Sequence, residues 1–238
     1  MKTKQKTTWT IRNLDIKYRN LYEQVADSLE EMIFEGGSDK MLLPTEFELA
    51  EKYEVSRSVI REALKILNER GLVSMRAGDG SYVNIPQSAV IGRVLGRVTR
   101  FNRISDDKIT KVRLLLEVEA AFTAATNATD EEIAELEDIN RQMELFKSDL
   151  EKRIYKDCEF HNAIARISRN ELLAFMVESL TELLRDYIRE RLVLNPAGNE
   201  DGIQFHWELI KAIKSHNPNK AKKVMHDHIE RSYHIINY

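Results

Sequence analysis

Three histidines and an aspartate in the C-terminal half of the chain have the chemistry of metal ligands. Asp157 and His161 lie four residues apart in the stretch DCEFH, so a helix places both on one face, where they could hold one ion. An exposed Asp–His pair without an ion is the alternative for two residues at this spacing. The other histidines therefore decide between these interpretations.

Two of those histidines are predicted to point into the protein. His206 and His228 each share a helical stripe with apolar residues, whereas His226 lies on a different face. The stripes consist of Ile203, Ile210 and Ile213 around His206, and of Ala221, Val224, Met225 and Ile235 around His228. A buried imidazole needs a polar partner, so several of them in one domain favour a shared polar centre.

The four side chains together predict one divalent metal ion per chain, held by Asp157, His161, His206 and His228. Three imidazoles and a carboxylate suit zinc, and nickel, iron or manganese are the alternatives. Histidines that merely pack and form hydrogen bonds in the core remain the competing interpretation.

A second chemical signature is the stretch VSRSVIREAL, in which Arg57 and Arg61 stand one helical turn apart. Ser56, Arg57 and Ser58 would open a helix, where free backbone N–H groups and the helix dipole favour a phosphate. Arg57 would enter the major groove of DNA, because its guanidinium fits the O6 and N7 atoms of guanine. Arg61 would contact a second base or a phosphate; an ordinary solvated helix face is the alternative.

The elements around these arginines predict a helix-turn-helix. The spacing of apolar residues indicates a first helix that includes Leu21 to Ile33 and is stopped by Gly36 and Gly37, and two further helices over about residues 46–53 and 57–68. Thr45 and Glu48 have the spacing of a capping box at the start of the second helix, and Ser56 is a suitable N-cap for the third. This motif consists of two helices joined by a tight turn, and its second helix begins with polar and basic residues.

A β-hairpin is predicted to follow the third helix as a wing. The runs LVSM and SYVNI indicate two strands, and the turn between them spans residues 76–80. Gly78 and Gly80 leave this turn slim enough to approach a minor groove, although hairpin geometry by itself also explains two glycines. Three helices plus this wing predict a winged helix-turn-helix domain over residues 18–85.

Beyond the wing the chain changes to long helical segments. Pro86 to Ser88 marks a linker, and residues 86–105 are expected to hold this linker and a connecting helix. From residue 106 to 238 we expect an all-α, metal- and effector-binding domain, so the fold is mostly α, with a six- or seven-helix bundle. Its helices are predicted over residues 106–127, 130–148, 150–168, 171–192, 201–215 and 218–236, with a less regular one over 88–103.

Composition limits the classes of protein that fit. The 238 residues carry a net charge of −3, a single cysteine, and no apolar run long enough to span a membrane. Residues 1–17 form a basic arm that could follow a phosphate backbone or act as a solubilising tail. A cytoplasmic protein with no membrane partner is expected.

The stretch from Leu43 to Val83, LPTEFELAEKYEVSRSVIREALKILNERGLVSMRAGDGSYV, resembles the winged-helix domain of GntR-type bacterial transcription regulators. Members of that family read L-P-S-E-R-x-L-A, then V-S-R-x-x-V-R-E-A-L, then G-L-V and a G-x-G wing, and the resemblance covers about residues 18–84. It implies contacts with operator DNA by Arg57, Ser58 and Arg61, with Thr45 near a phosphate and Gly78 at the wing.

Two positions depart from that pattern. Phe47 stands where the family commonly has a DNA-contacting arginine, and Asp79 places a carboxylate in the wing, where it would repel phosphate. Both departures concern the affinity or sequence preference of the domain rather than its fold.

The C-terminal region is similar to the FCD sensor domain of the FadR branch of these regulators. Its D-x3-H, later H and final A-x3-M-x2-H correspond to Asp157 with His161, to His206, and to Ala221 through His228. Arg113 and Glu117 also match an R-x3-E on its first long helix.

This second resemblance implies a metal in the bundle and a small carboxylate effector that completes its coordination. Arg113 is a candidate to pair the acid, and an i to i+4 salt bridge with Glu117 is the alternative role. Members of that branch answer to fatty acyl thioesters, lactate, citrate or sugar acids; a hydroxy acid or sugar acid is expected here.

Together these features predict a homodimeric transcription regulator, a repressor, whose operator binding is controlled by that effector. The alternative is a metal-dependent enzyme acting on a small organic acid.

Overall fold

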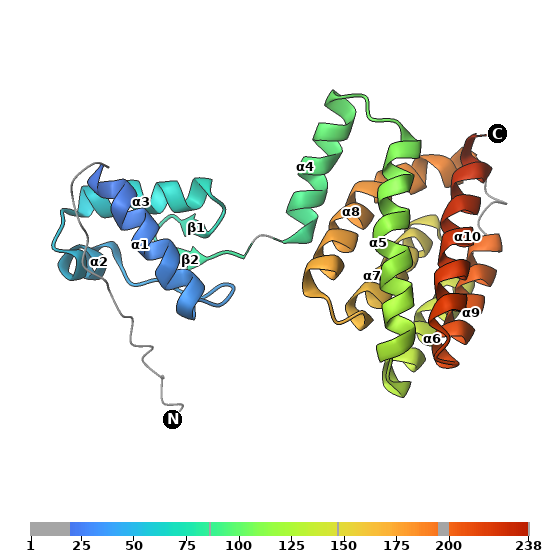
Figure 1. The fold of residues 1–238 in the computed structure, drawn as a ribbon. Helices are drawn as coiled ribbons and strands as arrows, with labels where there is room; N and C mark the ends of the chain where they lie inside the picture. Colours follow the sequence, from blue (N-terminus) through green and yellow to red (C-terminus); the bar gives the residue numbers. More distant parts are fainter. Residues whose placement is uncertain (1–19, 86, 147, 195–199, 238) are drawn as a thin grey trace. The chain divides into compact units, whose positions relative to one another are not determined.

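The computed structural model describes residues 20–85, 87–146, 148–194 and 200–237 of the chain. Contacts divide the chain into two compact units, one ending at residue 86 and the other beginning at residue 87 (Figure 1). The predicted basic arm, residues 1–17, lies outside the described residues.

The first unit is a three-helix domain with a two-stranded wing. Its elements are α1 (Leu21–Gly36), α2 (Glu46–Tyr53), α3 (Arg57–Glu69), β1 (Val73–Arg76) and β2 (Gly80–Val83). The strands pair antiparallel, with Val73 opposite Val83 and Arg76 opposite Gly80. Side chains from all three helices form one small core, among them Val25, Leu29, Leu49, Ile60, Leu64 and Leu67. This arrangement confirms the predicted winged helix-turn-helix.

Capping residues set the starts of α2 and α3 as the sequence predicted. The Thr45 hydroxyl accepts a hydrogen bond from the Glu48 backbone N–H at 3.2 Å, and the Glu48 carboxylate accepts from the Thr45 N–H at 2.8 Å. The Ser56 hydroxyl accepts from the Val59 N–H at 3.4 Å. Between the two helices Glu54 adopts a left-handed conformation, φ 55°, which turns the chain sharply.

The second unit is all-helical. It consists of α4 (Ser88–Phe101), α5 (Asp106–Asn127), α6 (Asp130–Leu145), α7 (Leu150–Ile167), α8 (Glu171–Leu194), α9 (Glu200–Lys214) and α10 (Pro218–Asn237). With α4 included, the described part of this unit is a seven-helix bundle, as expected. The helix bounds agree with the predicted ones to within a few residues.

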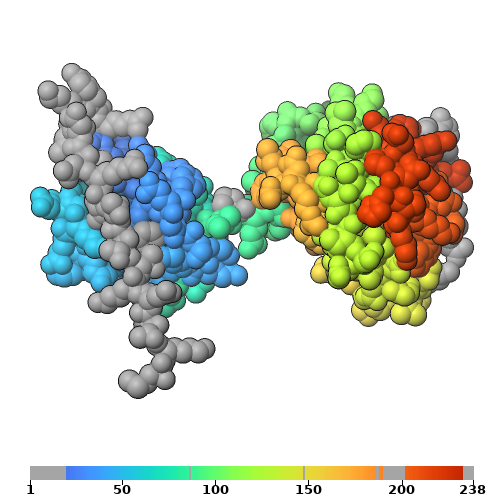
Figure 2. Space-filling view, turned by 60° about the horizontal axis from the view of Figure 1, so that its bottom comes forward, coloured from blue at the N-terminus to red at the C-terminus, as the bar shows by residue number. Residues whose placement is uncertain are grey.

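Packing in the second unit places six helices around one interior, with Ala174 and Val177 of α8 among its buried residues. α5 and α10 lie side by side on one face, and α6, α7, α8 and α9 complete the surroundings of the core (Figures 1 and 2). α4 packs against α8 at close range, because a Cβ atom on Gly92 would come within 2.6 Å of the Ser179 carbonyl oxygen. No helix in the described residues is long and apolar enough to cross a membrane.

Candidate metal centre and DNA-binding face

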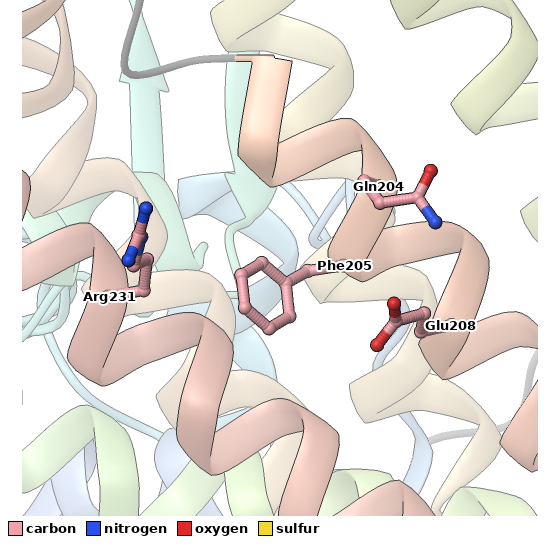
Figure 3. Close-up of a pocket in the computed structure, with 4 residues that line it drawn as sticks. All are labelled: Gln204, Phe205, Glu208 and Arg231. Atoms are coloured by element: carbon pink, nitrogen blue, oxygen red, sulfur yellow. The ribbon is translucent and has the colours of Figure 1, made fainter.

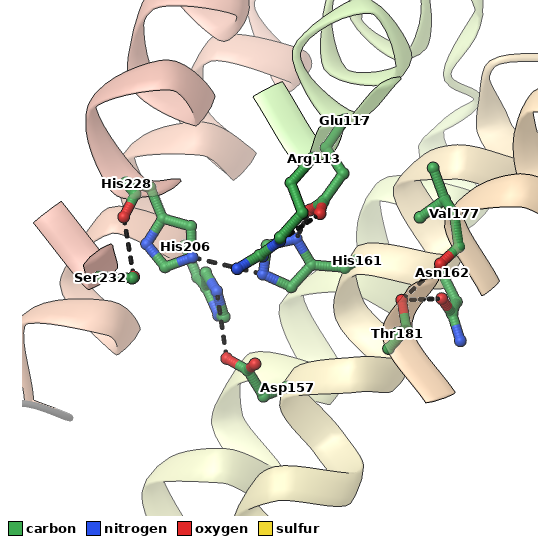
Figure 4. A network of polar contacts seen from close by, with 10 residues as sticks. All are labelled: Arg113, Glu117, Asp157, His161, Asn162, Val177, Thr181, His206, His228 and Ser232. Carbon is green, nitrogen blue, oxygen red and sulfur yellow. Dashed lines mark hydrogen bonds and ion pairs between the residues drawn. The ribbon is translucent and has the colours of Figure 1, made fainter. Parts of the chain in front are cut away.

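Three helices bring their histidines to one point inside the second unit. His161 of α7, His206 of α9 and His228 of α10 each offer a ring nitrogen, and these atoms all lie within 4.8 Å of one another (Figure 4). All three side chains are buried, His206 completely. The prediction that His206 and His228 point inward is confirmed, and His226 is exposed as expected.

The imidazole of His161 is oriented by a buried carboxylate. Its Nδ1 lies 2.6 Å from Oε2 of Glu117, close enough for Nδ1–H to donate, and its Nε2 lies 3.3 Å from Nε2 of His228. A proton held on Nδ1 leaves the lone pair of Nε2 facing the other histidines.

The imidazole of His206 is oriented by a buried amide. Asn140 of α6 donates through Nδ2 to the backbone carbonyl of Ile203 at 3.2 Å, and this carbonyl can only accept. The amide oxygen must therefore face Nδ1 of His206, 3.2 Å away, and accept its proton. Nε2 of His206 is then an unprotonated nitrogen directed inward. The Phe160 ring stacks on the His206 imidazole at a centroid distance of 4.0 Å.

The fourth predicted ligand, Asp157, borders the same space. Its Oδ1 lies 3.7 Å from Nε2 of His206, beyond hydrogen-bond distance (Figure 4). Burial raises the pKa of this carboxyl, against the opposing charges of His161 and Arg113. The structure thus brings together all four residues that the sequence indicated, with the aspartate at the edge of the histidine cluster.

The unsatisfied atoms of this cluster fit a cation. Nε2 of His206 and Nδ1 of His228 are buried and have no hydrogen-bond partner among the described residues. Burial, reinforced by the neighbouring histidines, lowers the pKa of both His206 and His228 well below the ordinary value, so both imidazoles are neutral. Neutral imidazoles with converging lone pairs are the form in which histidine binds metals.

Arg113 and Glu117 of α5 form a buried ion pair beside the histidines. The Arg113 Nε donates to Oε1 of Glu117 at 2.7 Å, which is the salt bridge considered as the alternative role for Arg113. Burial opposes ionisation of Glu117, but the charges of Arg113 and His161 outweigh it and hold the pKa of this carboxyl far below its usual range. The result is a continuous polar chain from Arg113 through Glu117 to His161 (Figure 4).

Two orienting residues of this centre were not predicted. Glu117 was expected only as a partner of Arg113, and its contact with His161 became visible only in the structure. Asn140 was not noted, although it is a polar residue at a core position of α6, spaced with Ile133, Leu136 and Met143. A polar side chain on an apolar helical stripe is the signal that could have found it.

An outward-opening pocket of about 250 Å³ lies between α9 and α10 (Figure 3). Among the described residues, its lining consists of Gln204, Phe205, Glu208 and Arg231. The ring of Phe205 is 5.7 Å from that of His228, so an aromatic side chain stands between the pocket and the histidines. The chemistry described above therefore belongs to the buried cluster and not to this surface hollow.

In the first unit, the predicted DNA-contacting arginines are exposed on α3. The side chains of Arg57 and Arg61 keep 62% and 52% of their surface open to solvent. Both approach Glu46 at the start of α2, Arg61 through two hydrogen bonds and Arg57 at 3.8 Å. The hydroxyls of Ser56 and Ser58 lie 2.8 Å apart at the N-terminus of α3, where free backbone N–H groups favour an anion.

The wing turn between β1 and β2 contains two glycines with positive φ. Gly78 and Gly80 have φ values of 76° and 126°, which other residues adopt only with strain. Asp79, expected to repel phosphate, lies 3.7 Å from the Arg76 guanidinium, which offsets its charge. Phe47 is 57% exposed on α2.

Comparison with known proteins assigns both units. Residues 21–83 match the bacterial regulatory proteins of the gntR family, and residues 108–231 match the FCD domain. The chain belongs to the GntR family. It is 30% identical to the HTH-type transcriptional regulator LutR of Bacillus subtilis, over 76% of this chain and 84% of LutR.

Further relatives agree with this assignment. The chain is 28% identical to the HTH-type transcriptional repressor NanR of Enterobacter, over 92% of this chain and 86% of NanR. The solved structure of Streptococcus agalactiae GntR shares 30% identity and a TM-score of 0.69, covering 88% of this chain and 97% of that one. The protein is thus a DNA-binding transcription regulator with an effector-binding domain, and the alternative of a metal-dependent enzyme has no support among its relatives.

Replacing Asn140 should weaken metal binding without removing a ligand. Asn140→Leu is nearly equal in size but cannot hold the His206 tautomer, so we expect zinc affinity to fall about 10- to 100-fold. Competition with a chromogenic chelator measures this affinity. Asn127→Leu is the matched control, because Asn127 also donates to a backbone carbonyl, that of Ser168, away from the histidines. Equal affinities for the two variants would contradict the orienting role of Asn140.

Proposed function

We propose that the second unit binds one divalent metal ion through His161, His206 and His228, with Asp157 as the fourth ligand. The observation that carries this proposal is the convergence of three buried imidazoles, whose ring nitrogens lie within 4.8 Å of one another, together with the lack of a hydrogen-bond partner for Nε2 of His206 among the described residues. Glu117 and Asn140 support it, since metal-binding histidines usually hold their second ring nitrogen in such hydrogen bonds.

Zinc is the proposed ion, and nickel, iron or manganese are the alternatives. Imidazole and carboxylate donors suit all of these ions, so the ligand set alone does not separate them. The bound ion would supply a Lewis-acidic position for an anionic oxygen of a ligand.

The proposed effector is a small carboxylate, of the hydroxy-acid or sugar-acid class. Arg113 would pair with its acid group while remaining bonded to Glu117, since the Glu117 carboxylate takes only two of its five N–H groups. The Arg113 side chain is only 14% exposed, so an anion that reached it would be largely withdrawn from water.

The proposed DNA-binding face comprises the start of α3, the capped start of α2 and the wing. Arg57 and Arg61 would contact base edges, and Thr45, Ser56 and Ser58 would contact phosphates. Gly78 and Gly80 would let the wing approach the minor groove. The exposure of both arginines in the DNA-free protein supports this assignment.

We further infer that the protein is a homodimer that acts as a repressor. α4 carries an exposed apolar stripe at helical spacing, formed by Val90, Val94, Val98 and Phe101. A second copy of the chain would cover this stripe, and two winged domains would then bind the two halves of a pseudo-palindromic operator. Effector binding would favour the arrangement that fits DNA poorly, with a coupling of about 1–3 kcal/mol.

The metal proposal predicts a thermal shift that depends on the histidines. Free zinc at 100 times its dissociation constant should stabilise the chelator-stripped protein by about 2.7 kcal/mol, or roughly 5–10 °C in the melting temperature. A variant with His161→Ala and His206→Ala should show no such shift. His226→Ala, which removes an exposed imidazole, should shift like the wild type. A full shift in the double variant would refute the proposed ligands.

The DNA proposal predicts a loss of specific binding at Arg57. Arg57→Ala should lower affinity for a duplex selected by the wild-type protein by about 1–3 kcal/mol, with a smaller loss on random DNA. Fluorescence anisotropy at fixed salt concentration measures both affinities. Arg166→Ala in the second unit removes an exposed cation as a control. Equal losses on both duplexes would show that Arg57 contacts only phosphate.

The dimer proposal predicts dissociation when α4 is charged. Val94→Glu combined with Val98→Glu should reduce the mass measured by light scattering from twice the chain mass of 27.7 kDa to that of one chain. Leu145→Glu also places a charge at an exposed apolar position, but on α6, and should leave the dimer intact. A dimer that survives the α4 substitutions would place the interface elsewhere.

A further inference from the structure

One carboxylate connects the first helix of the DNA-binding motif to an arginine of the second. Glu46 is the first residue of α2, and both of its oxygens accept from Arg61: Oε1 from Nε at 3.2 Å and Oε2 from Nη2 at 2.8 Å. The hydrogen bonds from Arg61 lower the pKa of Glu46 despite partial burial, so this carboxylate is ionised at neutral pH. The contact is therefore a bidentate ion pair and not a single hydrogen bond.

The geometry of this pair leaves the outer end of Arg61 open. Two of the five guanidinium N–H groups are bonded to Glu46, on the edge formed by Nε and Nη2. The N–H groups at the Nη1 and Nη2 end remain, on a side chain that is 52% exposed. Arg57 is held less tightly, because its Nη2 lies 3.8 Å from the same Oε2 and outside hydrogen-bond distance.

We propose that Glu46 is a positioning residue for base recognition: it fixes the guanidinium plane of Arg61 so that its open end can contact a guanine through two hydrogen bonds. This inference rests on the proposed DNA-binding face. A bidentate contact needs a defined guanidinium plane, and a free arginine loses much rotamer entropy when it adopts one. An arginine already held by a carboxylate loses less on binding.

The same carboxylate has an opposite effect on DNA in general. A negative charge beside the reading helix repels phosphates, and so weakens binding to every sequence alike. Positioning therefore requires Glu46 to strengthen operator binding while weakening non-specific binding. A carboxylate that acts only through its charge would weaken both.

The test compares two carboxylates of the same domain in the full-length protein. Glu46→Ala removes the partner of Arg61, and Glu62→Ala removes an exposed carboxylate of α3 that pairs with Lys65 instead. Each variant loses one negative charge. The probes are a duplex selected from a random library by the wild-type protein, and a scrambled duplex of the same length.

We expect Glu46→Ala to bind the selected duplex about 10-fold more weakly, from the lost preorganisation of one bidentate contact. On the scrambled duplex it should bind equally well or more tightly, and Glu62→Ala should not weaken binding to either. In an Arg61→Ala background, Glu46→Ala should no longer weaken binding to the selected duplex. Should Glu46→Ala fail to fold, Glu46→Gln keeps the shape of the side chain and removes its charge.

The outcomes separate this inference from the function on which it rests. If Glu46→Ala tightens binding to both duplexes as Glu62→Ala does, the carboxylate acts through charge alone and the positioning role is overturned. If Arg61→Ala itself retains the full sequence preference, the proposed role of Arg61 in the DNA-binding face fails first. Loss of preference in Arg61→Ala with no loss in Glu46→Ala overturns only the positioning role.

Discussion

The burial of three imidazoles in one interior is the constraint on which the second unit depends. Each ring must satisfy two nitrogens away from water, and an unsatisfied buried polar group costs free energy comparable to a lost hydrogen bond. Nδ1 of His206 is paired with Asn140, and Nδ1 of His161 faces the Glu117 carboxylate at 2.6 Å. On the inward side, one nitrogen of each ring lies within 4.8 Å of the other two, and Nε2 of His206 has no hydrogen-bond partner among the described residues. Because the five side chains of this network come from α5, α6, α7, α9 and α10, the centre exists only when these helices are packed together. A ligand of the centre therefore stabilises the whole bundle and not one element of it.

The DNA-binding face follows a different rule, because its charges stay in water. The exposed arginines of α3 contribute little to the stability of the domain. Their arrangement still depends on folding, since Glu46 reaches Arg61 only when α2 and α3 are packed through residues such as Leu49 and Ile60. The hydrophobic core of this domain thus sets the direction of a polar side chain on its surface. A regulator needs this combination, with a fixed scaffold and cationic side chains that remain available to DNA.

Most of the fold was predictable because its signals are local. The capping box at Thr45 and apolar stripes at helical spacing place the helix bounds within a few residues of those observed. The positions of His206 and His228 along their helices were also enough to predict that both side chains point inward.

The contacts that orient the site were not predictable in this way: Asn140 and His206 are 66 residues apart in the sequence, and Glu46 and Arg61 are 15 apart. Periodicity gives the face on which a residue lies but not the residue of another helix that it meets. For Arg113 the sequence left two roles open, and the ion pair with Glu117 is present in the structure without excluding the other.

The packing of α4 relates the proposed metal centre to the part of the chain that follows the DNA-binding domain. α7 carries Asp157 and His161 and packs on α8, and α8 in turn packs on α4. The contact at Gly92 has no room for even one added carbon atom, because a Cβ there would come within 2.6 Å of both the Ser179 carbonyl oxygen and Cβ of Glu182, so α4 and α8 lie in close van der Waals contact. Close-packed elements of this kind move as rigid bodies rather than deforming.

A displacement of α7 caused by a ligand at the histidines would therefore be passed through α8 to α4. The first residue of α4 follows directly on the junction between the two units. This contiguous packing gives the proposed effector a physical route to the placement of the DNA-binding domains, and it requires no ordered contact between the two units of one chain.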